Sequence, residues 1–337
     1  MTSVGTLRGA LLASGLMTLI LTAAPALAQP VPSVSQYPSH DATFDGGVTG
    51  HPDIVYSTVI GSRPLGLDIY QPKGKGPYPL VVYVHGGGWE RGEKRLAGTF
   101  PNWPQTLASI AQRGYVVASV SYRLSGEAKF PAPIIDVKSA IVWLRAHAAT
   151  YSIDPAKAVV WGASAGGQIA TIVGASCNVA SLPPRMLADA ATHPAPKDAE
   201  CVQGVIDWYG VTDFKTQDAG PPPAAEKGIF TPSGRYLGCE PANCPVALIE
   251  SAAPLAYLTN KTPPHLIIHG TLDRQVPVRE SIGLNDALKA KGVDAELLII
   301  SDVDHSFVAA TPERGYEVNK QVMGRVNAFL DRVTGRK

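Results

Sequence analysis

The stretch Ala158–Gly166, AVVWGASAG, joins a short apolar run to a small-residue turn that carries one serine. The run Ala158–Trp161 predicts a buried strand, and Gln168–Gly174 beyond the turn predicts a helix. Small residues two positions before and after Ser164 let a sharp strand-to-helix turn close without a clash. An incidental serine in a turn is the alternative. The strand before it and the helix after it favour a nucleophile held on such a turn.

Outward from this turn, the chain alternates apolar runs with segments of helical periodicity. The other predicted strands are Leu80–Val84, Tyr115–Val120, Gly204–Tyr209, Leu266–His269 and Glu296–Ile300. The other predicted helices are Pro133–Tyr151, Ser281–Lys291 and Tyr316–Val333. Near-continuous apolar strands separated by helices predict an α/β fold, with a mostly parallel central sheet covered by helices on both faces.

The alternation of predicted strands and helices covers residues 51–337, which we expect to form one catalytic domain. Two proline-rich stretches near 178–200 and 214–250 interrupt it, and long irregular insertions of this kind are usually functional loops or lids. Residues 29–50 are rich in Pro, Ser and Gly and predict an extended lead-in.

Residues 1–28 have a composition of their own. Arg8 is their only charged residue, an apolar run follows it, and Ala26-Leu27-Ala28 has the small-x-small form of a cleavage site. This pattern predicts a secretory signal peptide cleaved after Ala28, with a secreted or periplasmic product. An uncleaved membrane anchor is the alternative, and we expect no stable membrane insertion after cleavage.

Composition excludes several classes of function. The chain of 337 residues is 45% hydrophobic and 17% charged, so it has ample apolar material for a large core. Its 29 basic and 28 acidic residues give a net charge of +1, and no basic patch points to nucleic acid.

Four cysteines follow the predicted signal peptide, and in an oxidising compartment outside the cytoplasm they can form disulfides. Four cysteines allow three pairings, of which we expect Cys177–Cys201 and Cys239–Cys244. A zinc site is the alternative, but the chain has no Cys-x-x-Cys spacing and no His pair near the cysteines.

A nucleophilic serine needs a base and an acid, which follow it in the order serine, acid, histidine on this kind of turn. His305 comes directly after the last predicted strand, where ligand-facing residues of α/β sheets lie, and would be the base. Asp273, just past Leu266–His269, would orient it. Asp213 is the main alternative for the acid of the triad. Asp207 lies inside a predicted strand, where a structural role is expected.

The run His85-Gly86-Gly87-Gly88-Trp89 follows another predicted strand. Successive glycines permit backbone shapes that aim amide N–H groups at one point, and acyl transfer needs such donors beside the amide of Ala165. A flexible glycine loop is the alternative. His265 and His269 share one strand face, but no carboxylate or Cys cluster joins them, so we expect buried or edge histidines, no metal and no cofactor.

These motifs in this order resemble the α/β-hydrolase superfamily. The His-Gly-Gly-Gly element with the serine turn is similar to hormone-sensitive-lipase-like esterases, and more closely to the bacterial acetylxylan and feruloyl (tannase-like) esterase group. The similar segments are HGGGWERG (85–92), GYVVASVSYRL (114–124), FPAPIIDVKSAIVWLRAHAA (130–149), VWGASAGG (160–167), VIDWYGVTDF (205–214), LIIHGTLD (266–273) and HSF (305–307).

The resemblance implies Ser164, Asp273 and His305 as catalytic triad and the amides of Gly87, Gly88 and Ala165 as oxyanion donors, with Gly86 as a third glycine candidate. It implies a serine ester hydrolase acting on feruloyl, gallate-type or acetyl-polysaccharide esters, which the predicted signal peptide would export. Trp89, Trp208 and Tyr209 are candidates to bind the small-molecule or oligosaccharide ester. A generic short-chain carboxylesterase or lipase, an amide hydrolase, and a non-catalytic binding protein on the same scaffold are the alternatives.

Overall fold

The computed structural model describes residues 1–2, 40–214 and 230–336. Nearly all of the predicted signal peptide, the first part of the lead-in and residues 215–229 of the second insertion lie outside the described residues. From residue 40 onward, the lead-in contains strand β1 and the start of β2. Among the described residues, no helix is long and apolar enough to span a bilayer.

A nine-stranded sheet forms the centre of the described chain. The strands are β1 (Ala42–Phe44), β2 (Val48–Ser57), β3 (Leu65–Gln71), β4 (Tyr78–Val84), β5 (Val116–Val120), β6 (Ile153–Ala163), β7 (Gly204–Trp208), β8 (His265–Gly270) and β9 (Ala295–Ile300). Their order in space is β1-β2-β3-β5-β4-β6-β7-β8-β9. The strands from β5 to β9 in this order pair in parallel, and β1 to β3 add an antiparallel edge. The predicted fold class is confirmed.

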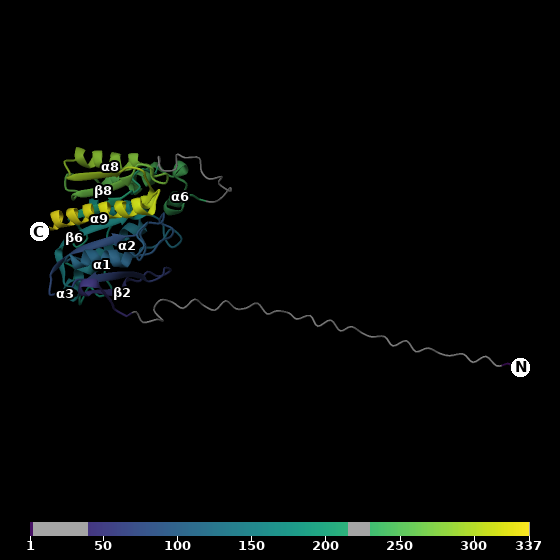
Figure 1. The fold of residues 1–337 in the computed structure, drawn as a ribbon, viewed down its shortest axis with the longest axis horizontal. Helices are drawn as coiled ribbons and strands as arrows, with labels where there is room; N and C mark the ends of the chain where they lie inside the picture. The colour runs from purple at the N-terminus through teal and green to yellow at the C-terminus, as the bar shows by residue number, and fades with distance from the viewer. Residues whose placement is uncertain (3–39, 215–229, 337) are drawn as a thin grey trace. The chain divides into compact units, whose positions relative to one another are not determined.

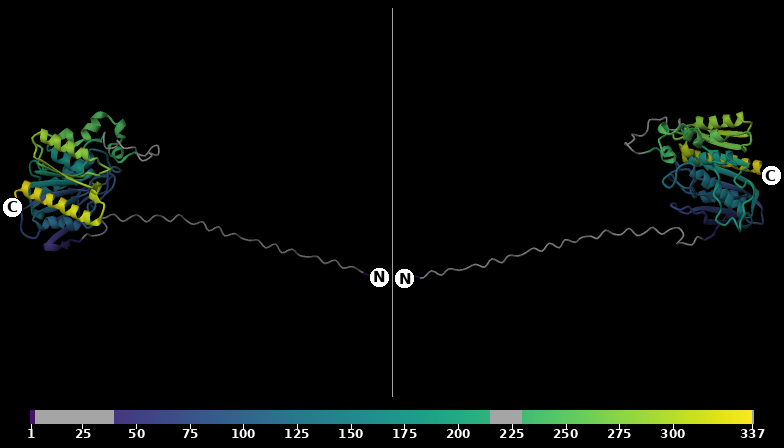
Figure 2. Two further views of the ribbon diagram at one scale, coloured as in Figure 1. Left: turned by 45° about the horizontal axis from the view of Figure 1, so that its top comes forward. Right: turned by 180° about the vertical axis from the view of Figure 1, so that it is seen from behind.

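Helices cover both faces of this sheet (Figure 1). One apolar cluster joins α2 (Ala132–Ala146) and α4 (Ala165–Ala175) to one face, and α8 (Val278–Ala290) packs on that side of β8 through Ile267. A second cluster joins α1 (Trp103–Gln112) and α9 (Pro312–Thr334) to the other face. Successive strand residues point to opposite faces, so strands buried on both sides read as continuous apolar runs. Figure 2 shows the helices and the sheet from two further directions.

The last helix shows how the sequence fixes an element and its partner face. In α9 the buried residues Val318, Val322, Val326 and Phe329 recur every three or four positions and form one apolar stripe. Each such side chain stabilises the fold by about 1.5–3 kcal/mol when fully buried. The helix begins four residues before the predicted start because the Thr311 side chain caps it, accepting from Arg314 N, and it ends at Gly335.

The predicted helix Pro133–Tyr151 is two helices in the structure. It breaks at His147, whose backbone leaves the helical region, and α3 (Ala148–Tyr151) follows. The nucleophile-bearing turn and α4 lie where the sequence predicts them, although α4 begins at Ala165, earlier than expected.

Both expected disulfides are present: Cys177 pairs with Cys201 and Cys239 with Cys244. The first closes the base of the 178–200 insertion. The described part of the second insertion carries α6 (Pro232–Leu237) and α7 (Val246–Ala252), and the other disulfide lies between these two helices.

Candidate active site

Ser164 lies at the carboxyl end of β6, on the turn into α4, with a positive φ of 56°. Such a backbone conformation is strained for a residue with a side chain and persists only where the surroundings enforce it. Here the Ser164 amide donates to Trp208 O at 2.8 Å, and the Ser164 carbonyl accepts from Gln168 N at 3.1 Å. The side chain is thereby turned away from the sheet into a cleft.

The glycines around Ser164 are required by close backbone contacts. A Cβ on Gly162 would lie 1.9 Å from Gly166 O, and a Cβ on Gly166 would lie 2.2 Å from Val84 O. Neither site has room for a methyl group, which is the packing that the serine motif predicts.

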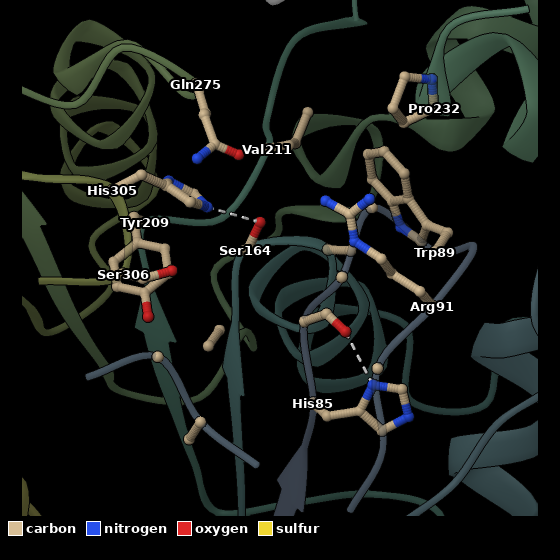
Figure 3. Close-up of a pocket in the computed structure, with 18 of the residues that line it drawn as sticks. His85, Trp89, Arg91, Ser164, Tyr209, Val211, Pro232, Gln275, His305 and Ser306 are labelled. Atoms are coloured by element: carbon tan, nitrogen blue, oxygen red, sulfur yellow. Dashed lines mark hydrogen bonds between the residues drawn. The ribbon is translucent and has the colours of Figure 1, made fainter. Parts of the chain in front are cut away.

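His305 joins Ser164 to Asp273. Its Nε2 lies 3.1 Å from Ser164 Oγ and its Nδ1 lies 2.7 Å from Asp273 Oδ2. The three residues come from the end of β6, the loop after β8 and the short helix η5 (His305–Phe307), all at the carboxyl edge of the parallel strands. The structure therefore brings together the three residues that the sequence selects, and Figure 3 shows His305 reaching toward Ser164.

Asp273 is held as an ionised acceptor. Its Oδ1 accepts from the amides of Gln275 at 2.9 Å and Val276 at 2.8 Å, while Oδ2 faces both His305 and His269. Burial alone would raise the pKa of Asp273, but the hydrogen bonds from His269 and His305 outweigh it and hold the pKa well below its usual range. A carboxylate of this kind keeps its negative charge beside His305.

The rival acids have other contacts. Asp207 is fully buried inside β7, where its carboxylate accepts from Gly210 N at 2.7 Å and Thr171 Oγ1 at 2.8 Å. It joins the middle of α4 to the chain after β7, as a structural residue would. The backbone amide of Asp213 donates to Glu280, and the Nδ1 atom of His305 lies against Asp273.

The glycine loop after β4 runs directly past Ser164. A Cβ on Gly86 would lie 2.7 Å from Ala163 O and 3.2 Å from Ser164 Cβ. Gly87 and Gly88 have positive φ values of 112° and 61°, which favour glycine. Ala165 is the first residue of α4, so its amide has no acceptor within the helix. Gly87, Gly88 and Ala165 line the same cleft as Ser164.

The buried ring of His85 holds the first glycine of this loop, Gly86. His85 Nδ1 lies 2.8 Å from Gly86 O, and its ring stacks on Tyr122 with 4.4 Å between centroids. Burial lowers the pKa of His85 to about 4, so the ring is uncharged near neutral pH. His85 therefore shapes the loop and does not exchange protons with a substrate.

A cleft of about 630 Å³ opens above Ser164. The glycine loop, His305 and Tyr209 line it, together with Gln275 from the Asp273 loop and Pro232 from the second insertion. Figure 3 shows Trp89 and Arg91 on the opposite side of Ser164 from His305. The insertion near 214–250 thus contributes to the cleft, while the cleft-lining residues include none from 178–200.

Two of the three aromatic residues expected to bind substrate line this cleft. Trp89 donates through Nε1 to Gln168 Oε1 at 3.1 Å and stacks on Tyr236, which leaves its ring in one orientation. The Tyr209 ring packs edge-on against His305 with 4.7 Å between centroids.

The third expectation is wrong. Trp208 does not line the cleft; it is fully buried in an aromatic cluster on the α1 and α9 face of the sheet. The partners of its ring in that cluster are Phe100, Trp103, Trp161 and Phe307. Both rings contact Phe307, but Tyr209 lies beyond the end of β7 with a positive φ of 42°, and its ring also packs on His305 at the cleft.

One contact of His269 is not predicted from the sequence. Burial of this histidine was expected, and it is 0% exposed, but it also lies beside Asp273, with 3.1 Å between Nε2 and Oδ2. Its place four residues before the acid, at the end of the same strand, is the one signal that could have revealed this contact.

One group of side chains in the described part of the chain has the composition of a metal site: His147, Asp189 and His193, whose ligand atoms lie within 4.8 Å of one another. Asp189 Oδ2 lies 3.0 Å from His147 Nε2 and 3.2 Å from His193 Nδ1. The two rings stack with an interplanar angle of 21°, so their in-plane lone pairs run side by side and do not converge. As placed, the three residues fit an ionic tether between the 178–200 insertion and α2 better than a metal centre.

A strand-to-helix serine turn, a histidine after the last strand and an acid after the strand before it define an α/β hydrolase with a Ser–His–Asp arrangement. Residues 67–288 match the BD-FAE family, and the chain belongs to that family.

Named relatives agree with this assignment. The chain is 28% identical to the esterase LipQ of Mycobacterium tuberculosis over 293 residues, 85% of this chain and 63% of LipQ. It is 35% identical to an AB hydrolase superfamily protein of Schizosaccharomyces pombe over 290 residues, 78% of this chain and 73% of that protein. The match spans only 46% and 52% of two further relatives from M. tuberculosis, LipM and LipC, so the chain covers about half to two thirds of the first relatives.

Solved structures share the fold. A thermophilic esterase from Thermogutta terrifontis is 25% identical with a TM-score of 0.60, covering 83% of this chain and 91% of that chain. A truncated carbohydrate esterase from gut microbiota is 22% identical with a TM-score of 0.68, covering 87% and 99%. At that identity the second match concerns the fold alone.

Proposed function

We propose that this protein is an exported serine carboxylic ester hydrolase with Ser164 as nucleophile, His305 as base and Asp273 as the orienting acid. The observation that carries the proposal is the position of His305, 3.1 Å from Ser164 Oγ and 2.7 Å from Asp273 Oδ2. These are distances over which a proton can pass from serine to histidine.

In the proposed reaction, His305 Nε2 takes the proton of Ser164 as Oγ attacks the ester carbonyl carbon. The carbonyl oxygen becomes an oxyanion, which the amides of Gly87, Gly88 and Ala165 stabilise. His305 then returns the proton to the leaving alcohol, and an acyl-enzyme remains. Water, activated by His305, releases the acid and restores Ser164.

Asp273 stays ionised through this cycle. Two backbone amides and the rings of His305 and His269 surround its carboxylate and favour the charged form, so it stabilises the imidazolium of His305 without taking its proton. The residues described in the reaction supply nucleophile, base and oxyanion donors, so the proposed chemistry needs no cofactor.

The substrate class we propose is a plant-derived ester: a feruloyl, gallate-type or acetyl-polysaccharide ester. Membership of the BD-FAE family and a 26% identical match to a bifunctional GH43-CE protein of Bacteroides eggerthii, covering 84% of this chain and 38% of that chain, support it. A cleft of about 630 Å³ lined by polar groups such as Gln275 can take a bulky alcohol or acyl group. Two disulfides support export to an oxidising compartment.

A hydrolysis panel tests the proposal. Purified protein is assayed on p-nitrophenyl acetate, p-nitrophenyl octanoate, methyl ferulate, methyl gallate and acetylated xylan, each beside Ser164→Ala. Preference for ferulate, gallate or xylan acetate supports the plant-ester class. Fast turnover of simple acyl esters alone reduces the proposal to a generic carboxylesterase, and turnover unchanged in Ser164→Ala overturns the mechanism.

A further inference from the structure

Two histidine rings approach the same oxygen of Asp273. His305 Nδ1 lies 2.7 Å from Oδ2, and His269 Nε2 lies 3.1 Å from it. His269 is the fifth residue of β8 and is completely buried. The proposed reaction assigns this second histidine no role, yet its position bears on the oxygen that orients the base.

The contacts of His269 define where its proton lies. Nε2 is also 2.9 Å from Val276 O, and a carbonyl only accepts, so Nε2 carries the hydrogen. Nδ1 is 2.7 Å from Ser281 Oγ, and a hydroxyl can donate to it. The neutral ring with hydrogen on Nε2 therefore donates to Val276 O and accepts from Ser281 Oγ, and the same hydrogen is shared with Asp273 Oδ2, 3.1 Å from Nε2.

These contacts also lock the ring in place. Ser281 belongs to α8, Val276 to the loop that carries Asp273, and His269 to the sheet. One side chain thus ties the acid-bearing loop to two rigid elements. Other groups around the ring are the buried carboxylate of Asp207, which acts on it electrostatically, and the Tyr209 ring, 6.3 Å away between centroids.

We propose that His269 is a positioning residue for the reaction. Its Nε2–H holds Asp273 Oδ2 in the direction that His305 requires and shares the negative charge of that oxygen with the His305 Nδ1–H. The two backbone amides from Gln275 and Val276 hold the other oxygen, Oδ1, so they cannot replace it. This inference rests on the proposed function of Ser164, Asp273 and His305.

Two measurable effects follow from removing the His269 donor. The carboxylate gains freedom to turn, so kcat falls by about 10- to 100-fold, the size expected for one hydrogen bond to a charged group. The substrate does not contact this buried ring, so KM stays within about twofold of the wild-type value. The undivided charge of Asp273 also stabilises protonated His305 more, so the acidic limb of the kcat/KM profile moves to higher pH.

The test compares His269→Phe, which has no donor, with His269→Gln, whose side-chain amide can donate from nearly the same place. His265→Gln is the matched control, because His265 lies on the same strand, is equally buried, and contacts Pro263 O at 2.7 Å away from Asp273. Circular dichroism and thermal unfolding establish that each variant is folded before kcat, KM and the pH profile are measured.

In His269→Phe we expect a loss of kcat and an upward shift of the acidic limb. His269→Gln should recover most of the activity. In His265→Gln, kcat and KM should stay within twofold of wild type and the acidic limb should not move. Wild-type kcat in a folded His269→Phe variant, or an equal loss in His265→Gln, overturns it. A loss of kcat with an unmoved acidic limb also overturns it, because a purely structural role would do the same.

If His269→Phe does not fold, the Ser281→Ala variant tests the positioning role of His269 instead. Without the Ser281 hydroxyl the ring loses its donor to Nδ1 and its orientation, so we expect kcat to fall about threefold to tenfold with the same shift of the acidic limb. An unchanged profile overturns the inference. If wild-type protein hydrolyses no ester, the proposed function fails. If wild type is active and Ser164→Ala is not, a negative result concerns His269 alone.

Discussion

Replacing Gly166 by alanine tests whether the close approach of α4 to the glycine loop is what builds the oxyanion site. Gly166 lies two residues after Ser164, where α4 passes the end of β4. An added Cβ would meet Val84 O at 2.2 Å and His85 O at 2.5 Å. Both atoms belong to the backbone, so no side chain can turn away to make room.

The size of the effect follows from those distances. The 2.2 Å contact must open to at least 3.0 Å, so helix and loop separate by close to an ångström. A displacement of about 1 Å at a reacting centre can cost roughly 100-fold in rate, and loss of one oxyanion donor costs about 100- to 1,000-fold. Overpacking of this kind also destabilises a fold by about 1–3 kcal/mol.

We therefore expect Gly166→Ala to fold with a lower Tm and to lose about 100-fold in kcat/KM on p-nitrophenyl acetate. Gly283→Ala is the matched control, because a Cβ there meets nothing within 4 Å on the surface of α8. Alanine in an exposed helix is favoured over glycine by about 0.5–1 kcal/mol, so this control should keep full activity with an equal or higher Tm. Wild-type activity and Tm in Gly166→Ala would refute the reasoning.

Three further perturbations have defined outcomes. Burial raises the pKa of Asp53, but bonds from Lys94 and Arg95 outweigh it and lower the pKa to about 2. The stability that Asp53 contributes is thus present above about pH 4 and is lost as pH falls toward 2. Urea midpoints of Asp53→Asn and wild type should converge over that range, and a constant difference would contradict it. Removing Cys177–Cys201, which spans 24 residues, should cost about 3 kcal/mol in urea unfolding, against about 2 kcal/mol for Cys239–Cys244, which spans 5; the reverse order would contradict the loop-entropy argument. Trp208→Phe should lower Tm and leave KM unchanged, because its ring lies in the core; a raised KM would place it at the substrate.

The sequence predicts the parallel half of the sheet well, because strands buried on both faces are continuous apolar runs. It misses the antiparallel edge for a physical reason. β2 contains Pro52 and Asp53, its pairing with β3 shifts register between His51 and Ile54, and Asp53 has a positive φ of 56°. A strand interrupted in this way has no regular alternation to detect.

The sequence predicts the site residues whose order along the chain is fixed by the motif. It does not predict which face of the sheet a buried strand residue points to, or which loop residues it contacts. Ser164, Asp273 and His305 follow from their places after three strands, and the structure brings them together. Trp208 fails because a fully buried strand gives no sign of which side each residue faces. The His269 contact depends on how the loop to Asp273 folds back, which the sequence alone does not encode as a pattern.

The central claim is that His305 and the glycine loop make Ser164 a reactive nucleophile. Fluorophosphonate labelling followed by intact mass and peptide mapping measures this directly, without a choice of substrate. The account predicts one label per chain, on Ser164, with labelling abolished in Ser164→Ala and strongly slowed in His305→Ala. Absence of labelling on the folded wild-type protein, or labelling at another residue, would contradict it and favour a non-catalytic scaffold.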